Sequence, residues 1–180
     1  MSTRVVATAI VMLAMSAPSW AADRNDFAIL QDVSRQVLRY PQFTIFDSVH
    51  AQVHGGVVTL SGKVTMPFKS EDIARRVAGV EGVHEVRNDV TVLPVSPLDD
   101  GLRLRIARAI YRNSSFWNYG AMANPPIHVI VERGRVTLEG VVNDNIERML
   151  ARSIASSFDA FSVTNNLKTS AEAKAELERL

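Results

Sequence analysis

The chain has 180 residues, of which 20 are basic and 19 acidic, and it contains no cysteine. The absence of cysteine excludes disulfide bonds, cysteine-ligated zinc, cysteine nucleophiles and a lipid-modified cysteine anchor. A formal net charge of +1 identifies no partner and argues against nucleic acid as one.

The N-terminal residues have the order typical of a secretory signal peptide. Arg4 precedes a mostly apolar run at residues 5–17, and Ser19 and Ala21 are small residues at the −3 and −1 positions of a cut after Ala21. The run is shorter than the roughly 20 residues that span a bilayer; an uncleaved membrane anchor is the alternative interpretation. We therefore expect residues 1–21 to be removed on export, which leaves a periplasmic chain without a transmembrane span.

An internal repeat is the strongest signal in the remaining sequence. Residues 49–64 and 127–142 align with a constant shift of 78 and are identical at eight of sixteen positions. A second match, with a shift of 77, relates residues 74–88 to 151–165. The chain therefore contains two copies of one structural unit.

Each copy reads as helix, strand, strand, helix, strand. Val49, Ala51 and Val53 alternate with polar residues, which predicts a half-buried strand. Apolar residues spaced three and four apart predict flanking helices; in the second copy they include Leu102, Ile106 and Ile110, and later Ile146, Leu150, Ala151 and Ile154. We expect an α+β fold of two tandem αββαβ modules, each a three-stranded sheet packed on two helices. The expected boundaries are 26–93 and 99–169, with a linker at 94–98 and a polar tail at 170–180 that is helical or frayed.

Five glycines have structural explanations in this pattern. Gly56 and Gly134 occupy the same place in the two hairpin turns, where a positive φ favours glycine. Gly62 and Gly140 stand late in the return strands, where a bulge or a close backbone approach is the usual reason. Gly82 precedes the last strand of the first copy.

These residues resemble the BON domain family. The strand motif G-x-V-x-L-x-G occurs at residues 56–62 and 134–140, and the closing V-x-N-x-[VL] occurs at 86–90 and 163–167. The paired arrangement is similar to that of osmotically inducible periplasmic proteins with two BON domains. One position departs from the family pattern: Asp159 stands where Gly82 stands in the first copy, so we expect that turn to differ.

The resemblance implies a binding role in the cell envelope. Members of the family are expected to bind phospholipid surfaces, and to protect or chaperone envelope proteins under osmotic and other envelope stress. The resemblance implies no reaction and no cofactor, and its shared glycines are structural.

The residues themselves give no sign of catalysis or of a metal site. No nucleophile elbow, phosphate loop or H-E-x-x-H motif is present. His50 and His54 point the same way along a strand, but ~13 Å apart at ~3.3 Å per residue, which is too far for one ion. His128 repeats His50 by duplication, and we expect these histidines to face solvent.

The second copy carries the candidate binding surface. Arg105, Arg108 and Arg112 share one face of a helix, where they can attract anionic headgroups. The segment that follows contains Phe116, Trp117 and Tyr119 in an insertion that the first copy lacks. One interpretation is a lipid-binding surface; the alternative is a solvated arginine face and a loop folded over the core. The competing function is a chaperone or interaction module for envelope proteins, which would use exposed apolar surface or sheet edges.

Overall fold

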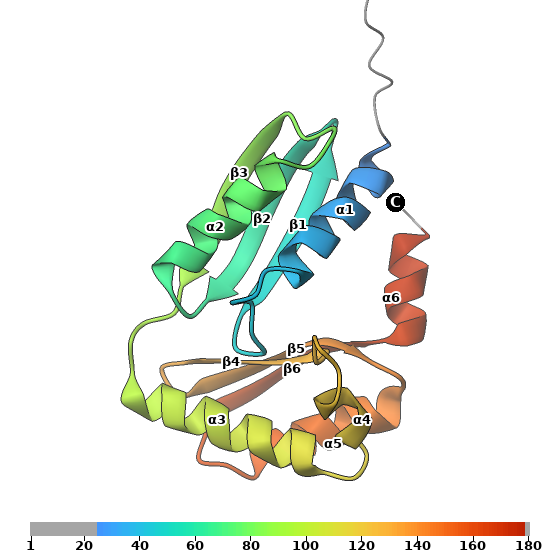
Figure 1. Cartoon of the computed structure of the whole chain (residues 1–180). Coiled ribbons are helices and arrows are strands. Elements are labelled where there is room, and N and C mark those ends of the chain that lie inside the picture. Colours follow the sequence, from blue (N-terminus) through green and yellow to red (C-terminus); the bar gives the residue numbers. More distant parts are fainter. Residues whose placement is uncertain (1–24, 179–180) are drawn as a thin grey trace, which may run out of the picture.

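The computed structural model of the chain describes residues 25–178, so the expected signal peptide lies outside the described residues. The described chain forms two three-stranded sheets, each with helices on one face. Figure 1 shows the two modules one above the other, joined by a single crossing of the chain. This is the α+β tandem fold that the repeat predicts.

The first module has a central strand with one antiparallel and one parallel neighbour. The sheet order is β1-β2-β3; β1 pairs antiparallel with β2, and β2 pairs parallel with β3. The parallel pair needs a crossover, which a helix supplies. The elements are α1 (Asp26–Leu38), β1 (Ser48–His54), β2 (Val57–Val64), α2 (Pro67–Ala78) and β3 (Glu85–Val92).

The second module repeats this topology and adds two short helices. Its sheet has the order β4-β5-β6, with the same antiparallel and parallel pairs. The insertion forms α4, and the polar tail forms α6 directly after the last strand. The elements are α3 (Pro97–Arg112), α4 (Trp117–Gly120), β4 (Ile127–Glu132), β5 (Arg135–Val142), α5 (Asn145–Ser156), β6 (Ser162–Thr169) and α6 (Ser170–Leu177).

Side-chain caps fix where several of the helices begin. Ser96 accepts a hydrogen bond from Asp99 N and starts α3 at Pro97, inside the segment that the sequence assigned to the linker. Thr169 and Glu172 form a capping box at the start of α6, which gives the tail a defined helix instead of a frayed end.

The first acid of each leading helix also fastens the hairpin of its own module. The Asp26 carboxylate accepts hydrogen bonds from Gly55 N and Gly56 N. The Asp99 carboxylate accepts the equivalent bonds from Arg133 N and Gly134 N, both at 2.8 Å. The two modules therefore use one device to hold the helix against the turn.

The modules pack on each other through the loop between α1 and β1. Val129 N in β4 donates a 2.7 Å hydrogen bond to the carbonyl of Ile45 in this loop. Ile45 and Phe46 also pack against the core of the second module, and Ile130 on the outer face of β4 is buried. The sequence left open whether the modules pack or move separately; the structure joins them.

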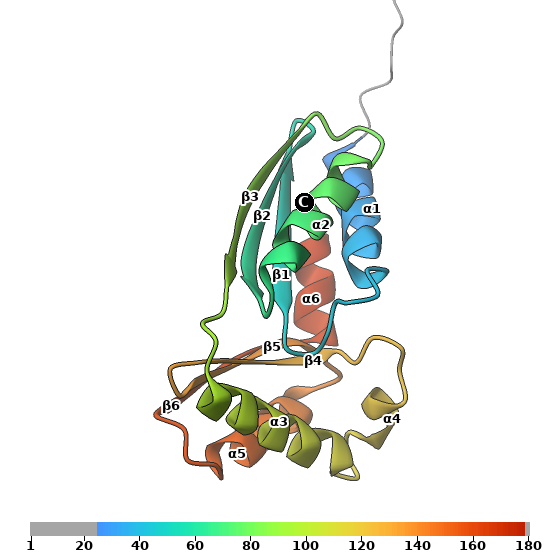
Figure 2. The same ribbon diagram turned by 60° about the vertical axis from the view of Figure 1, so that its left-hand side comes forward.

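This packing gives the two faces of the second sheet different neighbours. The first module stands on one face, and α3 and α5 cover the other, as Figures 1 and 2 both show. The outward sides of α3 and α5 therefore point away from the first module.

Candidate functional site

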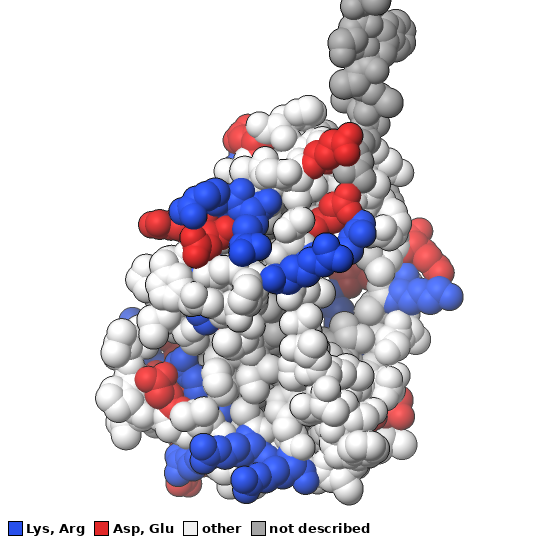
Figure 3. Space-filling model, in the orientation of Figure 1, with Lys and Arg blue, Asp and Glu red and all other residues white. Residues whose placement is uncertain are grey.

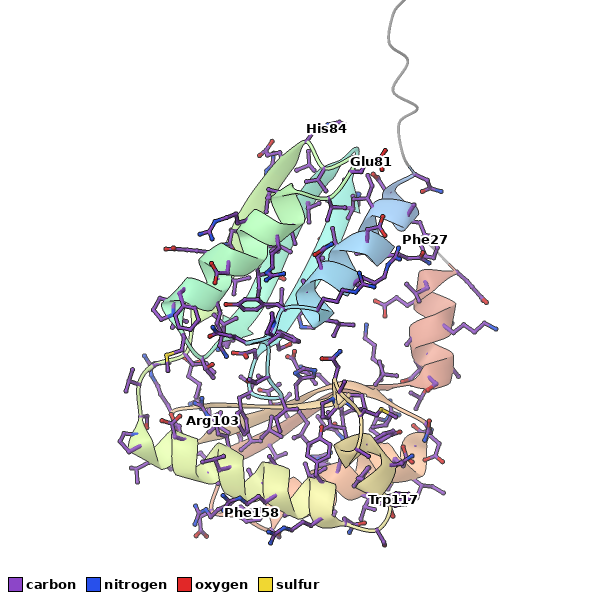
Figure 4. All side chains as sticks on the ribbon, viewed as in Figure 1. Phe27, Glu81, His84, Arg103, Trp117 and Phe158 are labelled. Carbon is purple, nitrogen blue, oxygen red and sulfur yellow. The ribbon has the colours of Figure 1, made fainter. Side chains whose placement is uncertain are left out.

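The arginines of α3 divide between the core and the surface. Arg105, Arg108 and Arg112 are exposed on the outward side of the helix, and Figure 3 shows basic side chains gathered over α3. Arg103 instead points toward the sheet (Figure 4), where its guanidinium donates to the carbonyl of Val131 at 3.1 Å. The three arginines that the sequence grouped thus share one exposed face.

The aromatic insertion mostly closes the core. Phe116 is fully buried in the second core. Tyr119 is also buried, and its hydroxyl donates a hydrogen bond to Glu147 at 2.6 Å. Burial, together with this hydrogen bond, raises the pKa of the phenol to about 12. Neither ring is available to a partner, because both fill the space between α3, α4 and the sheet. Trp117, the first residue of α4, is 70% exposed and lies at the outer end of the module (Figure 4).

The helix α5 adds apolar residues to this side of the module. Ile146 is 76% exposed and Met149 is 71% exposed, and Arg152 is exposed on the same helix. The apolar spacing that includes Ile146 predicted this helix, but Ala151 and Ala155 are its buried residues, so Ile146 faces outward. We call the outward side of α3, α4 and α5 the basic–apolar face; its residues are Leu104, Arg105, Arg108, Arg112, Trp117, Ile146, Met149 and Arg152.

The acids of these helices are engaged elsewhere. Asp99 is buried under the hairpin tip, and Asp100 pairs with Arg103 at 3.3 Å. Glu147 in α5 accepts hydrogen bonds from Tyr119 and from Asn143 N. Within α3 and α5 as described, no acid is left to neutralise the exposed arginines, so the face keeps its positive charge.

Of the histidines expected to face solvent, His50 and His54 are exposed and His128 is half-buried. His50 Nε2 lies 2.8 Å from a carboxylate oxygen of Glu139 in the other module. His128 Nδ1 lies 2.6 Å from the carbonyl oxygen of Asp47, and its ring stacks obliquely on Phe43 at 5.4 Å. Two of the four histidines therefore contribute to the contact between modules, and among residues 25–178 no cluster of His, Asp and Glu is arranged to hold a metal ion.

This contact shifts the titration of its charged groups. The hydrogen bond with Glu139 raises the pKa of His50, and the same bond, with one from Ser48, lowers the pKa of Glu139 to about 2. Burial lowers the pKa of His128. Burial acts to raise the pKa of Asp47, but hydrogen bonds from Lys69, Thr65 and Thr44 outweigh it and lower that pKa.

The glycines stand in turns and at close backbone approaches. Gly56 and Gly134 have φ values of 74° and 71° in the hairpin turns, and Gly82 has φ 88° before β3. A Cβ atom on Gly62 would lie 2.2 Å from the carbonyl oxygen of Ser48, and one on Gly140 would lie 1.8 Å from that of Pro126. Asp159, at the place of Gly82, does not adopt a positive φ, so the second turn differs.

No helix within residues 25–178 is long and apolar enough to cross a bilayer.

Comparison with solved structures finds two distant likenesses among its matches. The C-terminal domain of CdsD, a structural protein of the type III secretion system of Chlamydia trachomatis, is 16% identical with a TM-score of 0.33. That match covers 79% of this chain and 66% of that one. A second CdsD structure is 14% identical with a TM-score of 0.30 and is matched over 84% of this chain and 97% of its own. These values are too low to carry an argument about function.

Comparison with sequences gives one clear result. No curated protein matches the chain. The family model of the BON domain matches twice, at residues 25–94 and 99–171, which together include every strand. The chain belongs to the BON domain family and carries two copies of its domain.

Proposed function

We propose that the protein is a non-enzymatic binding protein of the cell envelope, exported to the periplasm, that docks on anionic phospholipid surfaces through the basic–apolar face. The observation that carries the proposal is the composition of this face. Exposed arginines on α3 and α5 stand beside exposed Trp117, Ile146 and Met149. Family membership supports an envelope role without catalysis.

The chemistry of the face suits a lipid–water interface. Each arginine near an anionic surface contributes about 1 kcal/mol of attraction, and tryptophan prefers the headgroup region because its ring is amphipathic. The apolar side chains at the surface can enter the headgroup boundary while the arginines contact phosphate. Because α3 and α5 lie on the far side of the sheet, the first module does not obstruct this approach.

Vesicle cosedimentation tests the proposal. The full exported chain is mixed with phosphatidylcholine vesicles, with and without phosphatidylglycerol, at low and high salt. We expect binding only to the anionic vesicles, weakened by salt, and reduced at least tenfold in Arg105→Ala/Arg108→Ala/Arg112→Ala. Trp117→Ala reduces binding without changing its salt dependence.

A matched triple variant controls for the loss of charge. Arg39, Arg75 and Arg87 are exposed residues of the first module, and their replacement by alanine removes the same three charges. Binding by this control stays near that of the wild type. Equal losses in the two triple variants, or equal binding to neutral vesicles, overturn the proposal.

A second candidate function is a chaperone or interaction module for envelope proteins. It is favoured by Val95 and Leu98, which are 95% and 85% exposed beside the crossing between modules, and by the edge strands β3 and β6. Exposed apolar side chains and open strand edges can pair with unfolded chains. A chaperone delays aggregation of an unfolded outer-membrane protein at equimolar ratio, and Val95→Ser/Leu98→Ser shortens that delay; no delay at any ratio removes this candidate.

A further inference from the structure

A groove lies where the first module stands on the second sheet. It encloses about 580 Å³ between the outer face of β4–β6 and the lower end of the first sheet. This side of the second sheet is opposite to the helices that carry the basic–apolar face. Five of the residues that line it carry hydroxyl groups: Ser48, Thr91, Thr137, Ser162 and Thr164.

The hairpin tip of the second module brings two arginines to the end of this groove. Arg133 and Arg135 line this groove. They also line a second hollow of about 650 Å³, whose other lining residues are Phe161 and Ser162. The two hollows share Arg133, Arg135 and Ser162, so they are parts of one depression. We call this depression, with both sets of lining residues, the inter-module groove.

The first module shows that the fold does not require these arginines. Gly55 and Val57 occupy the equivalent positions. In both hairpins a carboxylate of the leading helix accepts hydrogen bonds from the backbone of the turn. Arg133 has a φ of 52°, close to the 56° of Gly55. A left-handed backbone conformation is strained for an arginine, because its Cβ atom crowds the neighbouring carbonyl oxygen, and it is not strained for a glycine. The second copy thus holds a strained arginine where the first has an unstrained glycine.

The guanidinium groups of Arg133 and Arg135 are not paired with neighbouring acids in the described residues. Neither forms an ion pair or a side-chain hydrogen bond among the described residues. Of the acids along the groove, Glu132 pairs with Lys63, and Glu139 binds His50 and Ser48. Asp89 lines the opposite wall, in the first module. The end of the groove that contains the arginines and Phe161 has no acid among its lining residues.

An exposed aromatic ring completes this end. Phe161 is 87% exposed, and a Cβ atom on Gly134 would lie 2.5 Å from its ring, so the ring rests on the backbone of the hairpin turn. In the first module the ring of His84 lies in the same way on Gly56. The second copy therefore presents an apolar ring face directly beside two free cations.

We propose that the inter-module groove binds an anionic saccharide, a sugar that carries a phosphate or a carboxylate. Arg133 and Arg135 bind the anion, because the planar guanidinium matches the oxygens of both groups and forms paired hydrogen bonds with them. Thr137, Ser162 and Thr164 exchange hydrogen bonds with the sugar hydroxyls. Phe161 lies against the apolar face of the sugar ring. This site is separate from the lipid-docking face.

Isothermal titration calorimetry with four probes tests the site. Glucosamine 6-phosphate and glucuronic acid carry the two candidate anions, glucose carries none, and inorganic phosphate carries no sugar. We expect one or both anionic sugars to bind at least tenfold more tightly than glucose and than phosphate. Comparison of glucosamine 6-phosphate with glucuronic acid shows whether the site prefers a phosphate or a carboxylate. Binding of glucose equal to that of both anionic sugars overturns the proposal. Phosphate that binds as tightly as the sugar phosphate also overturns it, because the sugar then contributes nothing.

The first module supplies the variant. Arg133→Gly/Arg135→Val copies the turn of the first hairpin and relieves the strain at residue 133, so the protein is expected to fold at least as stably. It loses at least tenfold in affinity for the anionic sugar and keeps its binding to anionic vesicles. Arg105→Ala/Arg108→Ala is the matched control and has the reverse pattern. Sugar affinity unchanged in Arg133→Gly/Arg135→Val refutes the assignment, whatever the vesicle result.

Discussion

His50 Nε2 lies 2.8 Å from a carboxylate oxygen of Glu139, so that an edge strand of the first module and the central strand of the second share one ion pair. Ser48 donates a further hydrogen bond to the same carboxylate. His50 and Glu139 both line the inter-module groove. The contact between modules is therefore partly electrostatic, and this ion pair forms only while the histidine is protonated.

The first prediction concerns the pH dependence of this ion pair. The folded-state pKa of His50 is raised above its ordinary 6.5, so its contribution to stability is present below that pH and is lost as the pH rises through the folded value. His50→Gln should therefore lower the free energy of unfolding at acidic pH and have little effect at alkaline pH. Urea unfolding at a series of pH values measures this. His54→Gln, at the exposed far end of the same strand, is the control.

The second prediction is the opposite dependence for His128. Burial lowers the pKa of this ring, so its contribution is present above the ordinary value of 6.5 and is lost as the pH falls through the folded value. His128→Gln should therefore cost most at neutral and alkaline pH, and the cost should shrink on acidification. The facing groups are Asp47 and Glu139, which remain ionised because hydrogen bonds lower the pKa of both. Parallel curves for His50→Gln and His128→Gln would contradict both assignments.

The third prediction concerns the glycines of the return strands. Gly62 and Gly140 have φ values of 124° and 120°, and a Cβ atom on either would collide with a carbonyl oxygen of the neighbouring chain segment. Gly140→Ala should destabilise the protein by more than ~2 kcal/mol, because it adds a steric clash to a strained backbone conformation. Thermal unfolding followed by circular dichroism gives the value.

Gly101→Ala provides a control of the opposite sign. Gly101 is exposed inside α3, and a Cβ atom there meets nothing within 4 Å. Alanine in a helix interior is favoured over glycine by roughly 0.5–1 kcal/mol, so this variant should be more stable than the wild type. Equal effects of Gly101→Ala and Gly140→Ala would show that contact with the carbonyl of Pro126 is unimportant.

The module topology could be predicted because its determinants are local and occur twice. The alternation in β1 and β4, the glycine turns and the spacing of Leu102, Ile106 and Ile110 each fix one element. The repeat then shows that the five elements recur in one order. Neither signal depends on how the two modules contact each other.

The composition of the basic–apolar face was harder to predict. The three arginines share one side of α3 by periodicity alone. Ile146 and Leu150 are about 40° apart on a helix, so periodicity places them on one apolar stripe without showing which part of it reaches the core. Phe116 and Tyr119 lie in an insertion without a period, so their burial depends on the space left between α3, α4 and the sheet.

The contact between modules has one signal in the sequence, and it is easily overlooked. Ile45 and Phe46 are adjacent apolar residues in a segment that fits neither a helix nor a strand. Such a pair has no partner within its own module, which in retrospect points to a surface elsewhere. The groove was not predictable, because Arg133 and Arg135 are ordinary turn residues until the first module is placed against them.

The last prediction concerns the buried ion pair between Asp47 and Lys69. Asp47 ends the loop between α1 and β1, which packs against the second module. Asp47 is fully buried, and its carboxylate accepts hydrogen bonds from Lys69 Nζ at 2.7 Å and from Thr44 and Thr65. Lys69→Met leaves a buried carboxylate without its counter-charge and should cost ~3–5 kcal/mol. Asp47→Asn alone leaves the Lys69 ammonium without a counter-charge and is also costly. The double variant contains neither buried charge, so its cost should be well below the sum of the two single costs. Denaturant unfolding of all four proteins gives the coupling, and strictly additive costs would show that the pair is not what holds this loop.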